Sequence, residues 1–500
     1  MPRSQHYVAA PGATCADLAA HVAAAGCGAT PTVERARRTL LDSADRRLRR
    51  AGLYLLCDAG PLGCSLLLHD CDGRPCAPPL AMAQAPLTAA DLPDRAAREQ
   101  VAAILAPRTL VAVRSCALER ITLGCRDDDA KLLGDLVFAS HVDATSPDAP
   151  ATVTLSAWPR RGYRAELAAR LAAGLAAMPL TALDGTVGAL LDAVLPPSAA
   201  ELPRRTPPRP TPDATTVAAL AAQLDHYRTL MRDNEAGIRA GLDTEHLHDF
   251  RVALRRARTL HGALAGKTLP GGPGHEFAWL SSVTSRLRDL DVWCLQLTDA
   301  GDDDELAAAL DRERAREHDQ LVRVLDGARY AAFQAGWADW IEHAANAADP
   351  RRLGATVDQA LARRYARLRR RLGAAGGTSL DYPTLHAVRK DAKKLRYLLD
   401  AYATLYPGRH VEALLKPLKR LQSCAGALCD RHAHAALLEA WIRVARSARL
   451  RATLEAALAE LRPSPLIDLA APGSARLVAA LADIDAAARV VKRLSRRHRR

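Results

Sequence analysis

The 500-residue sequence has few aromatic side chains, no long apolar run and no closely spaced pair of cysteines. Phe, Trp and Tyr together make up only 4% of the residues. No run of about 18 apolar residues occurs, so no transmembrane helix is expected, and the first residues lack the apolar core of a signal peptide. The eleven cysteines include no CxxC pair, which argues against a zinc site. We therefore expect a cytoplasmic protein with free thiols, no cofactor and no bound metal.

The positive charge of the chain is concentrated in its C-terminal part. Residues 1–205 carry 22 Lys and Arg against 21 Asp and Glu, whereas the remaining residues carry 47 against 35. A Pro-rich segment, residues 201–213, separates the two parts. Closely spaced prolines exclude regular helix and strand, so this segment is predicted to be a linker. The sequence thus predicts one domain over residues 1–200 and a second, electrostatically active domain over residues 214–500.

The two predicted domains differ in fold class. In the first, helical and strand-like patterns alternate, which predicts an α+β domain with an antiparallel sheet. Its predicted helices are 16–25 and 163–177, and its predicted strands are 53–57, 65–69, 110–113, 136–140 and 152–157. The second domain has helical periodicity almost throughout, which predicts an all-α fold. Its predicted helices are 214–240, 246–264, 276–298, 303–325, 330–346, 353–373, 384–404, 410–424, 427–448 and 450–460.

A basic motif occurs twice in the all-α part, at an offset of 138 residues. Each copy has a His followed by basic residues three, seven, eight and ten positions later. On a helix, positions 0, 3, 7 and 10 fall within an arc of about 80°, so each copy places a His and three cations on one face. Two such faces brought together would form a cationic cavity for a polyvalent anion with phosphate-like oxygens. The two copies are His248, Arg251, Arg255, Arg256 and Arg258, and His386, Arg389, Lys393, Lys394 and Arg396.

The repeat continues beyond the motif, because residues 280–289 parallel residues 421–430. This pattern predicts two helical halves that arose by duplication and are related by a pseudo-twofold axis. The alternative is that each basic face is merely a solvated helix surface. Such surfaces usually mix charges of both signs, whereas acidic residues are nearly absent from these two faces. The repeated spacing therefore favours a functional site.

Four segments resemble motifs of the CHAD family, the conserved-histidine α-helical domain. They are residues 243–258, 288–292, 385–397 and 418–422, in the family's order, within a match over about residues 214–460. The resemblance implies a pair of helical bundles that binds inorganic polyphosphate in a basic central pore and associates with polyphosphate granules. It implies that the two motif copies supply the ligands, together with Arg288 and Lys419. One departure is that Cys429 stands where the repeat would place a counterpart of Arg288.

Residues 39–53 resemble the turn region of the CYTH family, whose fold is an antiparallel β tunnel that binds triphosphates. That family uses an opening E-x-E-x-K strand, in which the acids hold a divalent metal. The resemblance implies that the metal-binding and basic tunnel positions have been lost here, that Arg114 remains as one tunnel cation, and that the strand at 152–157 lacks the family's acid pair. The residues expected at the lost positions are Arg3, Gln5, Tyr7, Leu56 and Asp58.

These observations predict a binding protein with no catalytic residues. The expected ligand is inorganic polyphosphate, and the expected location is the polyphosphate granules of the cytoplasm. One alternative is a triphosphatase or polyphosphatase that uses the helical domain as a substrate clamp. Another is a nucleic-acid-binding protein that uses the basic tail, residues 489–500. The first alternative requires acidic metal ligands that the sequence lacks. The second is not supported by aromatic residues for base stacking in the tail.

Overall fold

In the computed structural model the chain divides into two units, Met1–Pro203 and Arg204–Arg500, each of which is described by itself. The division falls within the Pro-rich segment. The structure describes residues 5–24, 31–61, 63–71, 75–143, 151–175, 180–182, 188, 191, 194–195, 198, 200–265, 272–297, 304–347, 349–374, 379–445, 447–461, 466–471 and 474–494.

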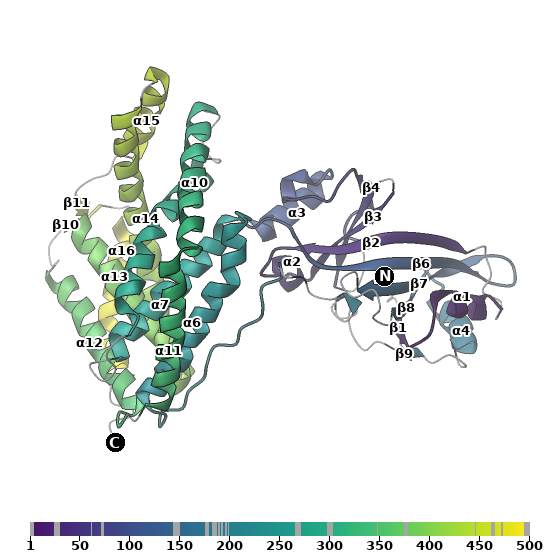
Figure 1. The fold of residues 1–500 in the computed structure, drawn as a ribbon, viewed down its shortest axis with the longest axis horizontal. Helices are drawn as coiled ribbons and strands as arrows, with labels where there is room; N and C mark the ends of the chain where they lie inside the picture. The colour runs from purple at the N-terminus through teal and green to yellow at the C-terminus, as the bar shows by residue number, and fades with distance from the viewer. Residues whose placement is uncertain are drawn as a thin grey trace. The chain divides into compact units, whose positions relative to one another are not determined.

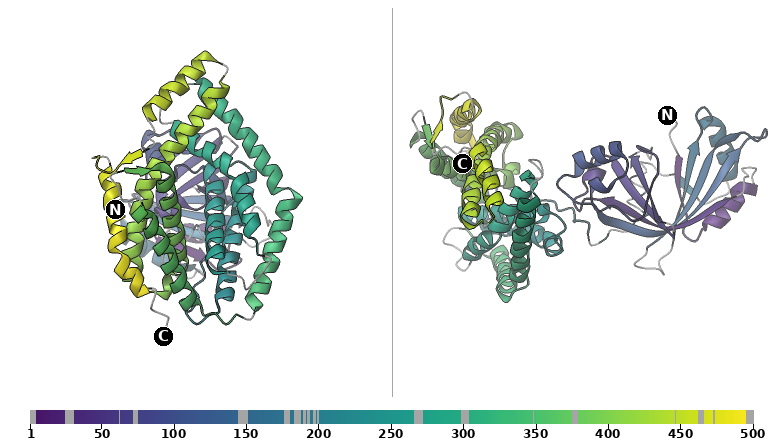
Figure 2. Two further views of the ribbon diagram at one scale, coloured as in Figure 1. Left: turned by 90° about the vertical axis from the view of Figure 1, so that its left-hand side faces the viewer. Right: turned by 90° about the horizontal axis from the view of Figure 1, so that it is seen from above.

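The described part of the N-terminal unit contains one antiparallel sheet with the strand order β5-β4-β3-β2-β6-β7-β8-β1-β9. The sheet curls, as the view from above shows (Figure 2), so that strands far apart in this order line a common interior. An antiparallel sheet of this form is compatible with a tunnel fold. The strands are β1 (Gln5–Ala9), β2 (Thr32–Asp42), β3 (Leu53–Gly60), β4 (Gly63–Asp70), β5 (Leu80–Met82), β6 (Val111–Arg126), β7 (Leu132–Asp143), β8 (Thr152–Pro159) and β9 (Leu180–Ala182).

Alternating side chains give the sheet apolar contacts on both faces. In β3, Leu53, Leu55 and Cys57 pack outward in a cluster with helices α2 (Arg47–Arg50) and α3 (Arg95–Leu105). Tyr54 and Leu56 point the other way, into a cluster inside the curled sheet. This is the period of two expected for a strand that is buried on both sides. Helices α1 (Cys15–Ala24) and α4 (Arg164–Leu175) cover the outer face of β6–β8.

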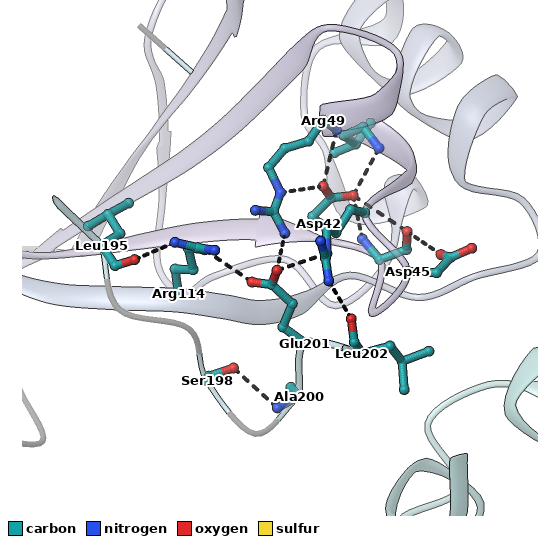
Figure 3. A network of polar contacts seen from close by, with 12 residues as sticks. Asp42, Asp45, Arg49, Arg114, Leu195, Ser198, Ala200, Glu201 and Leu202 are labelled. Atoms are coloured by element: carbon teal, nitrogen blue, oxygen red, sulfur yellow. Dashed lines mark hydrogen bonds and ion pairs between the residues drawn. The ribbon is translucent and has the colours of Figure 1, made fainter. Parts of the chain in front are cut away.

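The turn between β2 and β3 is held by a buried polar network (Figure 3). The Asp42 carboxylate accepts hydrogen bonds from the backbone N–H groups of Ser43, Leu48 and Arg49 at 2.7–3.1 Å. Glu201 closes the network by pairing with Arg49 and with Arg114. The residues just before the unit boundary are therefore fixed to the sheet. Arg114 also donates to the Leu195 carbonyl. It pairs in register with Leu40 of the inner cluster, so it lies on the inward face of β6, where Glu201 compensates its charge.

The C-terminal unit consists almost entirely of helices (Figure 1). Within the described residues none is long and apolar enough to cross a membrane. The helices are α6 (Thr216–Arg239), α7 (Thr244–Leu264), α8 (Gly274–Val283), α9 (Ser285–Leu297), α10 (Asp304–Leu325), α11 (Ala328–Asn346), α12 (Leu353–Ala374), α13 (Tyr382–Ala401), α14 (Gly408–Val444), α15 (Ala448–Leu461), α16 (Ala475–Ala486) and α17 (Ala488–Leu494). The short strands β10 (Ser379–Asp381) and β11 (Leu466–Asp468) pair with each other.

Helices α16 and α17 were not predicted, and two predicted helix boundaries differ from the structure. The predicted helix 276–298 is broken at Thr284 into α8 and α9, because Thr284 caps α8 and its hydroxyl bonds back to the Leu280 carbonyl at 2.8 Å. Conversely, the predicted helices 410–424 and 427–448 form the single helix α14, which continues through Pro417. One large apolar core joins α6, α7, α12, α13 and α14. Helices α7 and α13, which carry the two basic motifs, pack against each other.

Candidate functional site

A cavity of about 690 Å³ opens in the helical unit between four helices. Helices α7 and α13 each contribute one His and two cations, and α9 and α14 each contribute one Asp. The charged and histidine side chains that line it are His248, Arg251, Arg255, Arg288, Asp289, His386, Arg389, Lys393, Asp430 and His434. The sequence prediction that the two basic faces meet around one cavity is correct for motif positions 0, 3 and 7.

Arg251 is held by the break between α8 and α9. Its guanidinium donates hydrogen bonds to the Ser281 carbonyl at 3.1 Å and to the Thr284 hydroxyl at 2.5 Å. A helix end leaves carbonyl groups without an intrahelical partner, so the break creates acceptors where this Arg needs them. Arg288 is held at the start of α7, where it donates to the Thr244 carbonyl at 3.0 Å and lies 3.8 Å from Glu245. Contacts with neighbouring helices thus orient both cations.

In the second half of the repeat, the Asp430 carboxylate orients Arg389. Arg389 donates to Asp430 at 3.0 Å, and Asp430 occupies the position in α14 that matches Asp289 in α9. Asp289 lies beside Arg251 and Arg288, and burial raises its pKa against the opposing effect of these two cations. The five lining cations therefore face two acids, and the cavity keeps an excess of positive charge.

Crowding of like charges changes the acidity of the lining groups. Burial, with help from Arg255, lowers the pKa of Arg251 to about 10. Burial, followed by Arg389 and Arg255, lowers the pKa of Lys393 to about 8. The pKa of His386 also lies below its usual value, because of burial and of Lys390, Arg389 and Lys393 nearby. His386 is therefore a neutral group near pH 7, able to donate one hydrogen bond.

Several nitrogen atoms in the cavity walls are buried without a protein partner. They are Nε of Arg251, Arg255 and Arg389 and Nδ1 of His386. A buried donor left without a partner costs about 1–3 kcal/mol, and more when it is charged. These nitrogens are enclosed by the walls and contribute to the burial that lowers the pKa of Arg251. The walls pair Arg389 with Asp430 and still carry more cations than acids.

Motif positions eight and ten do not line this cavity, contrary to expectation. Arg256 and Arg396 both lie over the Tyr397 ring, at 5.5 and 5.2 Å from its centre. Both lie near Asp400, and so does Lys419. Position ten is about 15 Å along a helix from the His, so it lies beyond the two turns that border the cavity. Position eight lies about 80° away around the helix.

Arg258 and Lys394 belong to a further basic group beside α12. Arg364, Arg367 and Arg258 all act to lower the pKa of Lys394, after burial, while Asp391 raises it. Arg364 donates to the Thr259 carbonyl at 3.1 Å. The cations of α12 were not predicted, because α12 carries no copy of the basic motif.

Two other groups of predicted residues have different outcomes. In β1, His6 lines the interior of the curled sheet, whereas the prediction assigned the flanking Gln5 and Tyr7 to tunnel positions. Tyr7 packs in the outer cluster instead, so the predicted register was wrong by one residue. Arg3 lies outside the described residues, as do residues 495–500 of the basic tail. Leu56 lines the interior as expected.

Two acidic residues of the N-terminal unit, Asp58 and Asp127, have local structural roles. Asp58 forms a buried pair with Arg38. Asp127 closes a turn by accepting from the Lys131 N–H at 2.8 Å. Among the residues that the structure describes, no group of three or more His, Cys, Asp or Glu is arranged to hold a metal ion.

Comparison with known proteins identifies the helical unit. Residues 218–439 match the family model of the CHAD domain. A crystal structure of the CHAD domain from the plant Ricinus communis is similar with a TM-score of 0.47 and 24% identity. The similarity covers 56% of this chain and 97% of that one. No curated protein matches the sequence significantly. The chain thus contains a CHAD domain within its C-terminal unit, as its motifs predict.

Proposed function

We propose that the helical unit binds inorganic polyphosphate in the cavity between α7, α9, α13 and α14, and that it thereby associates with polyphosphate granules in the cytoplasm. The observation that carries the proposal is the convergence of Arg251, Arg255, Arg389 and Lys393, from the two motif copies, on one cavity. A linear polyanion offers closely spaced phosphate oxygens to all of them at once. Each contact would be a charge-assisted hydrogen bond.

The charge balance of the cavity supports the same ligand. The lining of this cavity of about 690 Å³ carries five cations and two acids, and Glu245 lies 3.8 Å from Arg288, so two positive charges remain uncompensated. A polyphosphate chain carries about one negative charge per phosphate, so a short segment would neutralise the excess and release counterions. A duplex DNA, with its wide and rigid backbone, would reach only the mouth of such a cavity. Shape should therefore favour polyphosphate over nucleic acid.

Binding is favoured over hydrolysis by the chemistry of the lining residues. The only carboxylates among the lining residues are Asp289 and Asp430, and both lie against arginines. They act as internal counterions, which hold the cations in place before the anion arrives. The lining contains no Ser or Thr beside a base that could act as an attacking nucleophile.

The test is a pair of double variants that each remove the cations of one half of the repeat. Arg251→Ala with Arg255→Ala, and Arg389→Ala with Lys393→Ala, should each weaken binding of long-chain polyphosphate at least tenfold and reduce its dependence on salt. Thermal unfolding of each variant establishes that the unit is folded. Unchanged affinity in both folded double variants would refute the assignment of this cavity.

A further inference from the structure

A second cavity, of about 310 Å³, lies inside the curled sheet of the N-terminal unit. Strands β1, β2, β3, β4, β6, β7 and β8 all contribute to its walls, so it is the interior of the tunnel. Most of the lining is apolar. Its polar and aromatic side chains are His6, Arg38, His69, Arg120, His141, Thr154, Ser156 and Trp158. Its volume is at the lower end of the roughly 300–1,000 Å³ typical of small-molecule sites.

The two cations of this cavity are already paired within the protein. Arg38 makes two parallel hydrogen bonds to the Asp58 carboxylate, at 2.7 and 2.6 Å. Arg120 pairs with Glu34 through its Nε at 3.0 Å, and its Nη1 lies 3.7 Å from Asp58. The guanidinium charges are thus compensated by two carboxylates. An anionic ligand would have to displace these acids, so the charge balance disfavours a triphosphate.

The three histidines of this cavity are neutral. Burial and the nearby Arg38 lower the pKa of His141 to about 3, against the opposing effect of Asp58. Burial lowers the pKa of His6. Burial and Arg38 lower the pKa of His69, against Asp58 and Asp70. His141 uses both ring nitrogens within the protein, with Cys116 Sγ 3.6 Å from Nδ1 and the Thr154 hydroxyl 3.2 Å from Nε2. The imidazoles therefore add polarity to the lining without charge, which suits an uncharged ligand.

The wall next to β8 combines hydroxyl groups with an aromatic surface. His6 Nδ1 lies 2.9 Å from the Ser156 hydroxyl, and His141 Nε2 lies 3.2 Å from the Thr154 hydroxyl. The Trp158 indole packs edge-on against His6, with ring centres 5.6 Å apart. Thr154 and Ser156 occupy the inward positions of the strand in which the tunnel family would carry acids. Aromatic and apolar walls with a few fixed polar groups favour a planar ligand.

We propose that the interior of the N-terminal unit is a binding site for a small, uncharged aromatic heterocycle, held between Trp158, the apolar wall and the three histidines. The lining residues thus assign to the tunnel a neutral ligand and not a metal-bound phosphate. This site is independent of the polyphosphate cavity in the other unit. Binding there would allow a small molecule to be sensed by a protein whose other unit takes a polyanion.

The experiment measures ligand-observed NMR saturation transfer from the full-length protein to matched neutral and anionic probes. Nicotinamide and nicotinate have nearly the same shape and differ in charge. Adenosine and tripolyphosphate extend the comparison to a larger heterocycle and to a pure anion. We expect transfer to nicotinamide or adenosine, with at least fivefold weaker transfer to nicotinate. No transfer to either neutral probe, or equal transfer to nicotinate and nicotinamide, would overturn the proposal.

Variants locate the binding and separate it from the polyphosphate site. Ala139→Phe fills the cavity and should abolish transfer to the neutral probes. Trp158→Leu, at a partly exposed position, should reduce transfer severalfold in case the filled variant does not fold. Arg251→Gln, in the other unit, is the control: it should keep the heterocycle signal and weaken polyphosphate binding. Neutral-probe signals unchanged in both Trp158→Leu and a folded Ala139→Phe would refute the location.

Discussion

Replacing Arg255 and Lys393 together by Gln should separate ligand binding from folding. These residues occupy the same motif position in the two halves and both line the cavity between α7, α9, α13 and α14. Neither side chain makes a hydrogen bond or ion pair with the described residues. After burial, Arg255 lowers the pKa of Arg251 and Lys393 contributes to lowering the pKa of His386. Removing them should therefore leave the thermal unfolding temperature unchanged or raise it. Most cavity-lining substitutions in other proteins have the opposite effect.

The loss of affinity can be bounded from the contacts that are removed. A hydrogen bond to a charged group contributes about 1.5–3 kcal/mol. Losing two would cost about 3–6 kcal/mol, which corresponds to about a 10²–10⁴-fold weaker complex at about 1.4 kcal/mol per factor of ten. The slope of log affinity against log salt should become shallower by about 1.4, since each phosphate contact contributes about 0.7 for a single-stranded polyanion.

The assay is isothermal titration of long-chain polyphosphate at several salt concentrations, combined with thermal unfolding. The matched control is Arg312→Gln with Arg323→Gln, which removes the same charge from exposed positions of α10. The control should lose little affinity. An equal loss in the two double variants would mean that net charge alone governs binding. A cavity variant that keeps both its affinity and its salt slope would refute the assigned contacts.

Three further predictions test individual groups. An anionic ligand prefers the protonated form of Lys393, whose pKa is about 8. Affinity should therefore fall as pH rises from 7 to 9, and protons should be taken up on binding near pH 8. Lys393→Arg should remove both effects, which titration calorimetry in different buffers would measure. Glu201→Gln should lower the free energy of unfolding of the N-terminal unit by about 1–3 kcal/mol in urea titrations. Arg114 and Arg49 hold the pKa of Glu201 low against the effect of burial. The stabilisation is therefore present above the unfolded-state pKa and is lost as pH falls through the folded-state pKa. At acid pH the free energies of unfolding of the variant and the wild type should become equal. Tyr406→Phe removes the 2.8 Å hydrogen bond to buried Asp358 and should destabilise the helical unit by about 1.5–3 kcal/mol. Equal urea midpoints for the variant and the wild type would contradict this prediction.

The basic cavity of the helical unit could be predicted from the sequence because helical periodicity is a local property. Positions 0, 3 and 7 of each motif share a helix face, and duplication made it probable that the two faces meet. The periodicity does not predict how many turns of α7 and α13 border the cavity. Arg258 and Arg396 were therefore assigned to the cavity although they lie beyond it. Likewise, Asp289 and Asp430 become internal counterions only through packing between helices.

The N-terminal unit was harder to predict because a strand has a period of two. A shift of one residue exchanges the inward and outward faces, and β1 has too little apolar alternation to fix its register. This explains why His6 was missed while Tyr7 was assigned to the interior. Arg38 and Arg120 come from neighbouring strands far apart in sequence, and only the pairing of β2 with β6 brings them to Asp58.

The measurement that tests the central claim most directly is binding of long-chain polyphosphate to the full-length protein across salt, with duplex DNA and tripolyphosphate as competitors. The account predicts tight binding that weakens steeply with salt and that DNA displaces poorly at equal phosphate concentration, because the cavity admits a thin chain but not a duplex. Displacement by DNA as effective as by polyphosphate itself would contradict the account and would reduce the cavity to a generic basic surface.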